Sequence, residues 1–311
     1  METVVLALGG NALIRPGEKG SYKEQAGNVR KVAQQIANVS KRYRLIVTHG
    51  NGPQVGHTVL RHEAARSQLP PFPLDACVAE TQGFIGYLIQ RSLLDCLDER
   101  HPAPVSIVTL VEVDPDDSAF KDPTKPIGPV YSRDEAEQLR MATPHLLLSD
   151  NSGKGLRRLV PSPKPKRILE AEVIKALSSA GHTVVCCGGG GIPVVRLPNG
   201  GITGMEAVID KDLTSMRIAI EVTAERLIML TDVEGAYLNY GTDRQQLLGE
   251  IGANRMFEFL RSGHFKIGSM EPKVRAALDF LESGGQMAVI GHLDNLEAAV
   301  EGQTGTRIKR S

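Results

Sequence analysis

Glycine-rich turns follow three segments of the chain that are expected to be strands. They are Gly9-Gly-Asn11, His49-Gly-Asn-Gly-Pro53 and Gly188-Gly-Gly-Gly191. Glycine lets the backbone approach an anion closely, and the N–H groups of a following helix add a favourable potential. In an open parallel sheet, ligands bind beyond the carboxyl ends of the strands, where these turns are expected. A single turn of this kind is weak support, but the three together predict a site for a phosphorylated ligand.

Three lysines supply the positive charge that phosphoryl transfer requires around the transferred group. Lys273 follows Pro272, which suits the first position of a helix, and Lys211 stands between two aspartates at another expected helix start. Lys125 is flanked by prolines in Pro123-Thr-Lys-Pro126. The alternative for each lysine is a solvated surface position without a ligand.

Other residue patterns narrow the chemistry. Neither G-x-x-x-x-G-K-[ST] nor G-x-G-x-x-G occurs, which argues against a P-loop enzyme and a dinucleotide-dependent dehydrogenase. His57 and His62 are five residues apart and lack a carboxylate motif, so no metal site held by the protein is expected. The expected strand Arg226–Leu230 is followed by Thr231-Asp-Val233 and Tyr237-Leu-Asn-Tyr240, a place suited to a nucleotide. Core packing is the alternative role for both tyrosines.

Composition excludes several classes of partner. The 311 residues carry 36 Lys+Arg and 36 Asp+Glu, so the formal net charge is zero, and aromatic residues make up only 4%. Such a chain lacks both the positive field and the stacking platforms of a nucleic-acid-binding protein. No uncharged stretch is free of glycine and proline for the length of a membrane span, and no signal peptide is recognised. The four cysteines are expected to be reduced core thiols, so a cytoplasmic protein is predicted.

Strand and helix patterns alternate along the chain. Such alternation predicts an α/β protein, a three-layer αβα sandwich around a mostly parallel open sheet, as a single domain over residues 1–311. The expected strands are Thr3–Leu8, Leu45–Thr48, Val105–Val111, Thr183–Cys187, Arg226–Leu230 and Gln286–Ile290. The expected helices include Tyr22–Lys41, Asp75–Asp98, Glu170–Ala180, Pro272–Glu282 and Leu296–Val300.

One long segment interrupts this alternation. Residues 114–167 are rich in Asp, Pro, Gly, Lys and Arg at both ends, and the capping-box spacing of Ser132 and Glu135 predicts a helix between them. Long loops in compact domains are usually functional. We therefore expect an inserted lid subdomain at about 114–167. A smaller excursion at Pro198-Asn-Gly-Gly201 predicts a hairpin turn.

An ordered set of motifs resembles the carbamate kinases of the amino-acid-kinase superfamily over essentially the whole chain. A lone Gly-Gly-Asn would be nonspecific, but the set at this spacing is highly specific. The matching segments are Ala7-Leu-Gly-Gly-Asn-Ala-Leu13, Thr48-His-Gly-Asn-Gly-Pro-Gln-Val-Gly56, Pro73-Leu-Asp-Ala-Cys77, Phe120-Lys-Asp-Pro-Thr-Lys-Pro-Ile-Gly-Pro129, Val160-Pro-Ser-Pro-Lys-Pro165, Cys187-Gly-Gly-Gly-Gly-Ile-Pro-Val-Val195, Glu206-Ala-Val-Ile-Asp-Lys-Asp-Leu213, Gly263-His-Phe265 and Gly268-Ser-Met270.

The resemblance implies reversible phosphoryl transfer between ATP and carbamate, with Mg²⁺ carried by ATP or ADP, in a homodimer. It implies that Lys125, Lys211 and Lys273 neutralise charge and that Asp212 orients lysines. The phosphoryl group and the small acid would be bound by Gly9, Gly10, Asn11, Gly50, Asn51 and Gly52. The nucleotide would be bound by Lys211, Thr231, Asp232, Tyr240, Met270 and Lys273.

Three positions depart from the pattern of these enzymes: Lys154 and Leu156 in the expected lid, and Glu271 beside Pro272. They leave substrate choice and efficiency open. Two alternatives therefore remain, a kinase of another small acid in the same superfamily and a nucleotide-binding regulatory protein that has lost turnover. Ala7 and the prolines around Lys125 argue against the first alternative, and the presence of all three lysines argues against the second.

Overall fold

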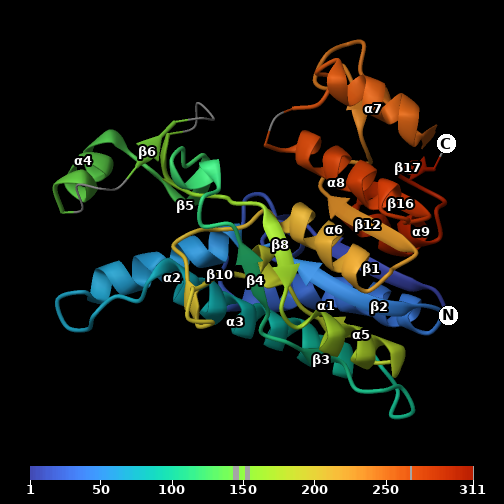
Figure 1. The fold of residues 1–311 in the computed structure, drawn as a ribbon, viewed down its shortest axis with the longest axis horizontal. Helices are drawn as coiled ribbons and strands as arrows, with labels where there is room; N and C mark the ends of the chain where they lie inside the picture. The colour runs from blue at the N-terminus through green and yellow to red at the C-terminus, as the bar shows by residue number, and fades with distance from the viewer. Residues whose placement is uncertain (143–146, 151–154, 267, 311) are drawn as a thin grey trace.

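A central sheet of eight strands organises the computed structural model, which describes residues 1–142, 147–150, 155–266 and 268–310 (Figure 1). The strands from β16 to β3 in its spatial order are mutually parallel, and β17 is antiparallel to β16. In that order the strands are β15 (Glu250–Gly252), β17 (Thr306–Lys309), β16 (Met287–His292), β12 (Arg226–Thr231), β1 (Thr3–Leu8), β2 (Arg44–His49), β9 (Val184–Val185) and β3 (Val105–Ser106).

Helices cover both faces of this sheet. Along β1, Val5 and Ala7 belong to one buried cluster, and Val4, Leu6 and Leu8 belong to another, as the two-residue period of a strand requires. The first cluster includes side chains of α5 (Ala171–Ser179), α6 (Lys211–Glu221), α7 (Ala253–Arg261) and α8 (Met270–Glu282). The second includes side chains of α1 (Tyr22–Ser40), α3 (Leu74–Leu94) and α9 (Leu296–Val300). The predicted αβα sandwich is confirmed.

Smaller sheets accompany the main sheet. One has the order β11 (Ile202–Gly204), β10 (Ile192–Arg196), β4 (Leu110–Val113) and β8 (Pro165–Ile168). The turn between β10 and β11 confirms the predicted hairpin at Pro198–Gly201, where Leu197 N–H donates to the Gly201 carbonyl. A two-stranded ladder joins β13 (Tyr237–Leu238) to β14 (Gln246–Leu247).

A protruding unit, which we define as β5 (Lys125–Tyr131), α4 (Arg133–Ala142), β6 (Leu148–Ser149) and β7 (Leu156–Val160), projects from the sandwich (Figure 1). Its antiparallel sheet has the order β5-β7-β6. The capping box is present, since Ser132 Oγ accepts from Glu135 N–H and the Glu135 carboxylate accepts from Ser132 N–H. The unit lies inside the range 114–167, whose last residues contribute β8 to the flanking sheet. Residues 143–146 and 151–154 of this range lie outside the described part.

Two expected strands were too long. Val105–Val111 is divided, because the chain leaves the main sheet after β3 and enters the flanking sheet at β4. Between them Thr109 is buried, and its N–H donates to the side chain of Gln82 instead of a neighbouring strand. The strand expected at Thr183–Cys187 is reduced to β9, because Cys187 takes a left-handed conformation with φ 53°. Two expected helices also differ, since α3 ends at Leu94 and α8 begins at Met270.

Candidate active site

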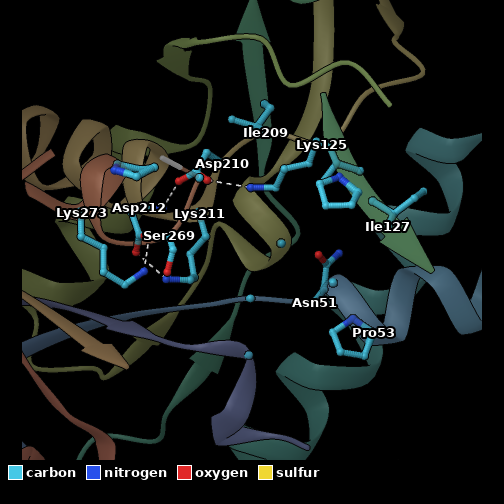
Figure 2. Close-up of a pocket in the computed structure, with 18 residues that line it drawn as sticks. Asn51, Pro53, Lys125, Ile127, Ile209, Asp210, Lys211, Asp212, Ser269 and Lys273 are labelled. Atoms are coloured by element: carbon cyan, nitrogen blue, oxygen red, sulfur yellow. Dashed lines mark hydrogen bonds and ion pairs between the residues drawn. The ribbon is translucent and has the colours of Figure 1, made fainter. Parts of the chain in front are cut away.

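The first turn of α6 supplies the centre of the site. Asp210 is the N-cap of this helix, and its carboxylate accepts the N–H groups of Asp212 and Leu213. Lys211 Nζ donates to Asp212 Oδ1 at 2.5 Å, and Lys273 Nζ, from α8, donates to Asp212 Oδ2 at 2.7 Å (Figure 2). One carboxylate therefore joins two helices and fixes two ammonium groups beside each other. We call Lys211, Asp212 and Lys273 the buried cluster.

Burial governs the electrostatics of this cluster. The side chains of Lys211 and Lys273 are only 14% and 13% exposed, so neither is the solvated surface lysine that the sequence left open. Burial raises the pKa of Asp212, but the two ammonium groups outweigh this effect and hold the pKa well below its usual range. Burial lowers the pKa of Lys211, whereas for Lys273 the carboxylate outweighs burial and the pKa is raised.

Lys125 enters the site from the protruding unit. Its Nζ donates to Asp210 Oδ2 at 2.7 Å, and its side chain is 32% exposed (Figure 2). Burial raises the pKa of Asp210, but Lys125 reverses this effect, and the pKa is lowered. Two aspartates flank Lys211 in the sequence, and either is near enough along the chain to hold that lysine. Asp212 does so, whereas Asp210 instead pairs with Lys125, a residue 85 positions away.

Two glycine turns meet beside these lysines. A Cβ atom on Gly50, which follows β2, would lie 3.5 Å from Gly10 N and 3.6 Å from Lys211 Cδ. A Cβ atom on Gly9, which follows β1, would lie 2.8 Å from the Leu230 carbonyl oxygen. Gly9 therefore leaves no room for a side chain, whereas a Cβ atom on Gly50 would make ordinary contacts with the first turn and with Lys211. The side chain of Asn11 lies outside the described residues.

The third glycine turn packs against Asn51. A Cβ atom on Gly189 would lie 2.1 Å from Asn51 Nδ2, so only glycine allows this approach. Asn51 is buried, and its Nδ2 donates to Thr81 Oγ1 of α3 at 2.8 Å. The side chain is therefore fixed between α3 and the turn, immediately before α2 (Gly52–Ala65) begins.

A cavity of about 300 Å³ gathers most of the residues predicted to bind the phosphoryl group and the small acid. Gly9 is absent from its lining. The lining combines the first two glycine turns, the start of α2, the three lysines and the turn before α8. Its residues are Gly10, Gly50, Asn51, Gly52, Pro53, Lys125, Pro126, Ile127, Gly189, Val208, Ile209, Asp210, Lys211, Asp212, Gly268, Ser269, Pro272 and Lys273.

A second cavity, of about 170 Å³, adjoins the first. Ser269 and Lys273 line both cavities. The predicted nucleotide residues Thr231, Asp232, Tyr240 and Met270 line the second cavity, whereas Lys211 does not. Val233 and Tyr237 also line it, and both belong to segments that the sequence indicated as suited to a nucleotide. The remaining lining residues, His264, Phe265 and Lys266, had no role assigned from the sequence, and the motif Gly263-His-Phe265 was the only signal. Tyr240 is exposed, with its ring centroid 5.6 Å from that of Tyr237, so it is not part of the core.

His49 is a buried residue that the sequence did not single out. Burial lowers its pKa to about 4, and nearby Lys211 acts in the same direction. The neutral ring lies 3.1 Å, at Nδ1, from the Gly50 carbonyl oxygen, which must accept the ring proton. A Cβ atom on Gly188 would meet the same ring at 2.5 Å. His49 therefore fills the space beneath two of the glycine turns.

The departures from the family pattern lie away from both cavities where they are described. The Glu271 carboxylate accepts from Arg275 at 2.8 Å, one helical turn further along α8, and lines neither cavity. Leu156 pairs with Tyr131 in the protruding unit, and Lys154 lies outside the described residues. Because α8 begins at Met270, the prediction that Pro272 takes its first position was wrong by two residues. Lys273 remains in the first turn.

Within the described ranges, no three His, Cys, Asp or Glu side chains are grouped so that they could bind a metal ion. In the same part of the chain, no helix combines the length and apolar character needed to cross a bilayer. Tyr22, Tyr87 and Leu94 are exposed on α1 and α3.

Comparisons with known proteins show what the whole chain is similar to. The model of the amino acid kinase family matches residues 2–292. A carbamate kinase of Pyrococcus furiosus is 48% identical over 98% of each chain, and a carbamate kinase-like protein of Escherichia coli is 45% identical over 99% of this chain and 98% of the other. The structure of a carbamate kinase from Giardia lamblia bound to AMP-PNP has a TM-score of 0.92 and 42% identity, and covers 100% of this chain and 99% of the other.

Proposed function

The chain belongs to the amino acid kinase family, and from this premise we propose that it is a carbamate kinase. It passes the phosphoryl group of carbamoyl phosphate to ADP, giving ATP and carbamate, and catalyses the reverse reaction. The bond from phosphorus to the carbamoyl oxygen breaks while a bond forms to a terminal oxygen of ADP. The observation that carries this proposal is that Lys273 lines two adjoining cavities, one suited to a small anion and one to a nucleotide.

The residues of the first cavity have the character that such a transfer requires. In-line transfer depends on positioning and on stabilising the charge that spreads over the transferred group. The N–H groups at the start of α2 supply partial positive charge, and Lys125, Lys211 and Lys273 supply full charges on the opposite sides. Asp212 keeps two of these lysines in place. Carbamate is already an anion, so no carboxylate or imidazole of the protein is needed to remove a proton from it. Positioning and charge are therefore sufficient.

Thr231, Asp232, Tyr240 and Met270 would bind the nucleotide in the second cavity, with Lys273 at its phosphate end. The Giardia lamblia carbamate kinase is bound to AMP-PNP, which supports a nucleotide as a ligand of this chain. We further propose that Mg²⁺ enters with the nucleotide, held chiefly by its phosphates. Mg²⁺ usually binds through one or two carboxylates plus the phosphates of the substrate. Among the described residues, Asp210 and Asp212 are already paired with lysines, so the nucleotide phosphates would supply most of the ligands. The bound ion would neutralise phosphate charge.

We also propose that the protein is a cytoplasmic homodimer, as its resemblance to carbamate kinases implies. The exposed aromatic and apolar side chains of Tyr22, Tyr87 and Leu94 offer an apolar surface to a second copy. The four cysteines are free, as expected in a reducing compartment. Sedimentation equilibrium would test the dimer, and a monomer mass at micromolar concentration would contradict it.

Initial rates of the purified protein in both directions test the activity. Carbamoyl phosphate is a mixed anhydride, so ATP synthesis is the downhill direction. Carbamate has four heavy atoms, and at a ceiling of about 1.5 kcal/mol per atom its affinity is modest. The phosphorylated substrate carries a phosphoryl dianion in place of the single negative charge of carbamate, and offers more oxygens to the backbone N–H groups and lysines. We expect a far lower KM for carbamoyl phosphate than for carbamate. ATP formation that is undetectable at saturating carbamoyl phosphate, ADP and Mg²⁺ would leave the regulatory alternative ahead.

A further inference from the structure

Strand β5, which bears Lys125, is docked on helix α2. Ile127 of β5 and Val55 of α2 belong to the same buried cluster, and both are almost fully inaccessible to solvent. The next residue on each element is a glycine. A Cβ atom on Gly56 would lie 2.1 Å from Gly128 Cα and 2.5 Å from Gly128 N, far inside any normal contact. The two backbones therefore touch, and they can do so only because Gly56 has no side chain.

The neighbours of Gly128 restrict how the strand could move away. Gly128 takes φ +72°, and the pairing of β5 with β7 is irregular between Ile127 and Tyr131. Arg157 of β7 donates from Nε to the Gly128 carbonyl oxygen at 3.1 Å. A left-handed conformation, a break in the ladder and an arginine contact all lie at one residue. The Gly128 carbonyl is thus tied to β7, while the Cα and N atoms of the same residue contact Gly56 of α2.

This contact connects two parts of the site. Helix α2 presents Gly52 and Pro53 to the first cavity, and one turn later Gly56 sets the distance between the helix and β5. Lys125 lies three residues before Gly128 on the same strand, and its ammonium group reaches Asp210 at 2.7 Å. Any displacement of β5 along the Gly56–Gly128 direction is transmitted to Lys125 through a short, extended segment.

We propose that Gly56 and Gly128 are positioning residues, whose backbone contact sets the reach of Lys125 into the phosphoryl-transfer site. The inference rests on the proposed function, because it assigns this reach a role in turnover. A methyl group on Gly56 requires β5 to retreat by about 1 Å, and a misplacement of this size can cost on the order of 10²-fold in rate.

Gly56→Ala tests the proposal. We expect kcat for ATP synthesis to fall by roughly 10–10²-fold, while the KM for ADP stays within about two-fold because the second cavity is lined by other elements. Gly27→Ala is the matched control: Gly27 is also helical, in α1, and a Cβ there meets nothing within 4 Å. It should leave kcat unchanged. A Gly56→Ala enzyme with kcat within two-fold of the unmodified protein would overturn the proposal.

A double-mutant cycle separates positioning from general disturbance. If Gly56 acts through Lys125, Gly56→Ala should have almost no further effect on kcat in a Lys125→Ala background. An equal loss in both backgrounds would show that Gly56 acts by another route and would overturn the proposal. Activity of the unmodified protein is measured first, so a failure of the proposed function is recognised separately.

Amide exchange gives a readout without turnover. In Gly56→Ala, exchange in β5 should be faster than in the unmodified protein, whereas exchange in β1 and β12 should not change. Unchanged exchange in β5 would contradict the proposed displacement. If Gly56→Ala does not fold, Arg157→Met removes the bond to the Gly128 carbonyl without adding an atom at the contact. We expect Arg157→Met to lower kcat by about three- to ten-fold when Lys125 is present and to have no effect in the Lys125→Ala background. An equal loss of kcat in the two backgrounds would overturn the proposal.

Discussion

The site contains two kinds of lysine–aspartate interaction, and they differ in how they are supported. The buried cluster of Lys211, Asp212 and Lys273 lies on α6 and α8, whose other faces pack on the main sheet. The pair of Lys125 and Asp210 joins α6 to a strand of the protruding unit. The first is almost inaccessible to solvent, whereas about one third of the Lys125 side chain is exposed.

This difference in burial distinguishes the ammonium groups that are fixed in the site from the ammonium group of Lys125, which can move toward a ligand. Separating either ammonium group from this buried carboxylate would leave a buried charge without its partner, which costs about 3–5 kcal/mol. A partly exposed pair between two structural units is weaker, because water screens it. Lys125 can therefore leave Asp210 and turn toward an anion in the cavity. The contrast predicts that the cluster is permanent and that the position of Lys125 depends on ligand.

The largest expected effect is on turnover. Lys125→Ala, Lys211→Ala and Lys273→Ala should each lower kcat by ~10²–10³, or roughly 3–4 kcal/mol, by analogy with the loss of other electrostatic donors. Only Lys273→Ala should also raise the KM for ADP markedly, because Lys273 alone of the three lines the second cavity. Steady-state rates of ATP synthesis measure both quantities.

Lys31→Ala, on the exposed face of α1, is the control and should leave both kinetic constants unchanged. A kcat within a few-fold of the unmodified protein for any of the three site variants would remove that lysine from the mechanism.

A smaller effect is expected on stability, because the contribution of the buried cluster to the free energy of unfolding depends on pH. The folded pKa of Asp212 is below the value of 3.8 for a free side chain. Its ionised form therefore stabilises the fold fully above about pH 4, and this contribution is lost as the pH falls through the folded pKa. Asp212→Asn leaves two buried ammonium groups unpaired and should lower the free energy of unfolding by about 3 kcal/mol at pH 7. The difference from the unmodified protein should begin to narrow below about pH 4 and should narrow further as the pH falls toward the folded pKa.

Urea denaturation at a series of pH values measures this difference. Asp243→Asn, in an exposed loop, is the control and should show no such narrowing. A difference between Asp212→Asn and the unmodified protein that stays constant down to pH 3 would mean that the carboxylate is not stabilised by its lysine partners.

The smallest expected effect is on motion. If the protruding unit closes over the cavity and excludes water, its amides should exchange more slowly when ADP and an unreactive analogue of carbamoyl phosphate are bound together. Strand β5 should show the change most clearly, while helices α6 and α8 should show little. Exchange in the protruding unit that is the same with and without ligands would remove the lid from the mechanism and leave Lys125 as fixed as the other two lysines.

The sequence predicted the parts of the site that depend on local rules. Strand β1 and helix α9 have the bounds that their apolar patterns predicted. The Ser132 capping box and the hairpin at Pro198–Gly201 follow from side chains within a few residues of the backbone groups that they affect. The three lysines were identified as candidates from the residues beside them in the sequence, and the structure brings all three to one cavity.

Tertiary structure decided the pairing of charges and the contacts between distant backbones. Lys211 and Asp212 are adjacent in the chain, so their pairing could be suggested from the sequence. Lys273, however, is 61 residues from Asp212, and Lys125 is 85 residues from its partner Asp210. Nothing local distinguishes Asp210 from Asp212 as a partner, because the choice depends on which distant lysine the folded chain brings to each carboxylate. Gly56 and Gly128 likewise look like ordinary turn or helix glycines until β5 is docked on α2. The sequence determined which groups can carry the charge, and packing determined where each group is fixed, since contacts between remote segments form only when the core closes around them.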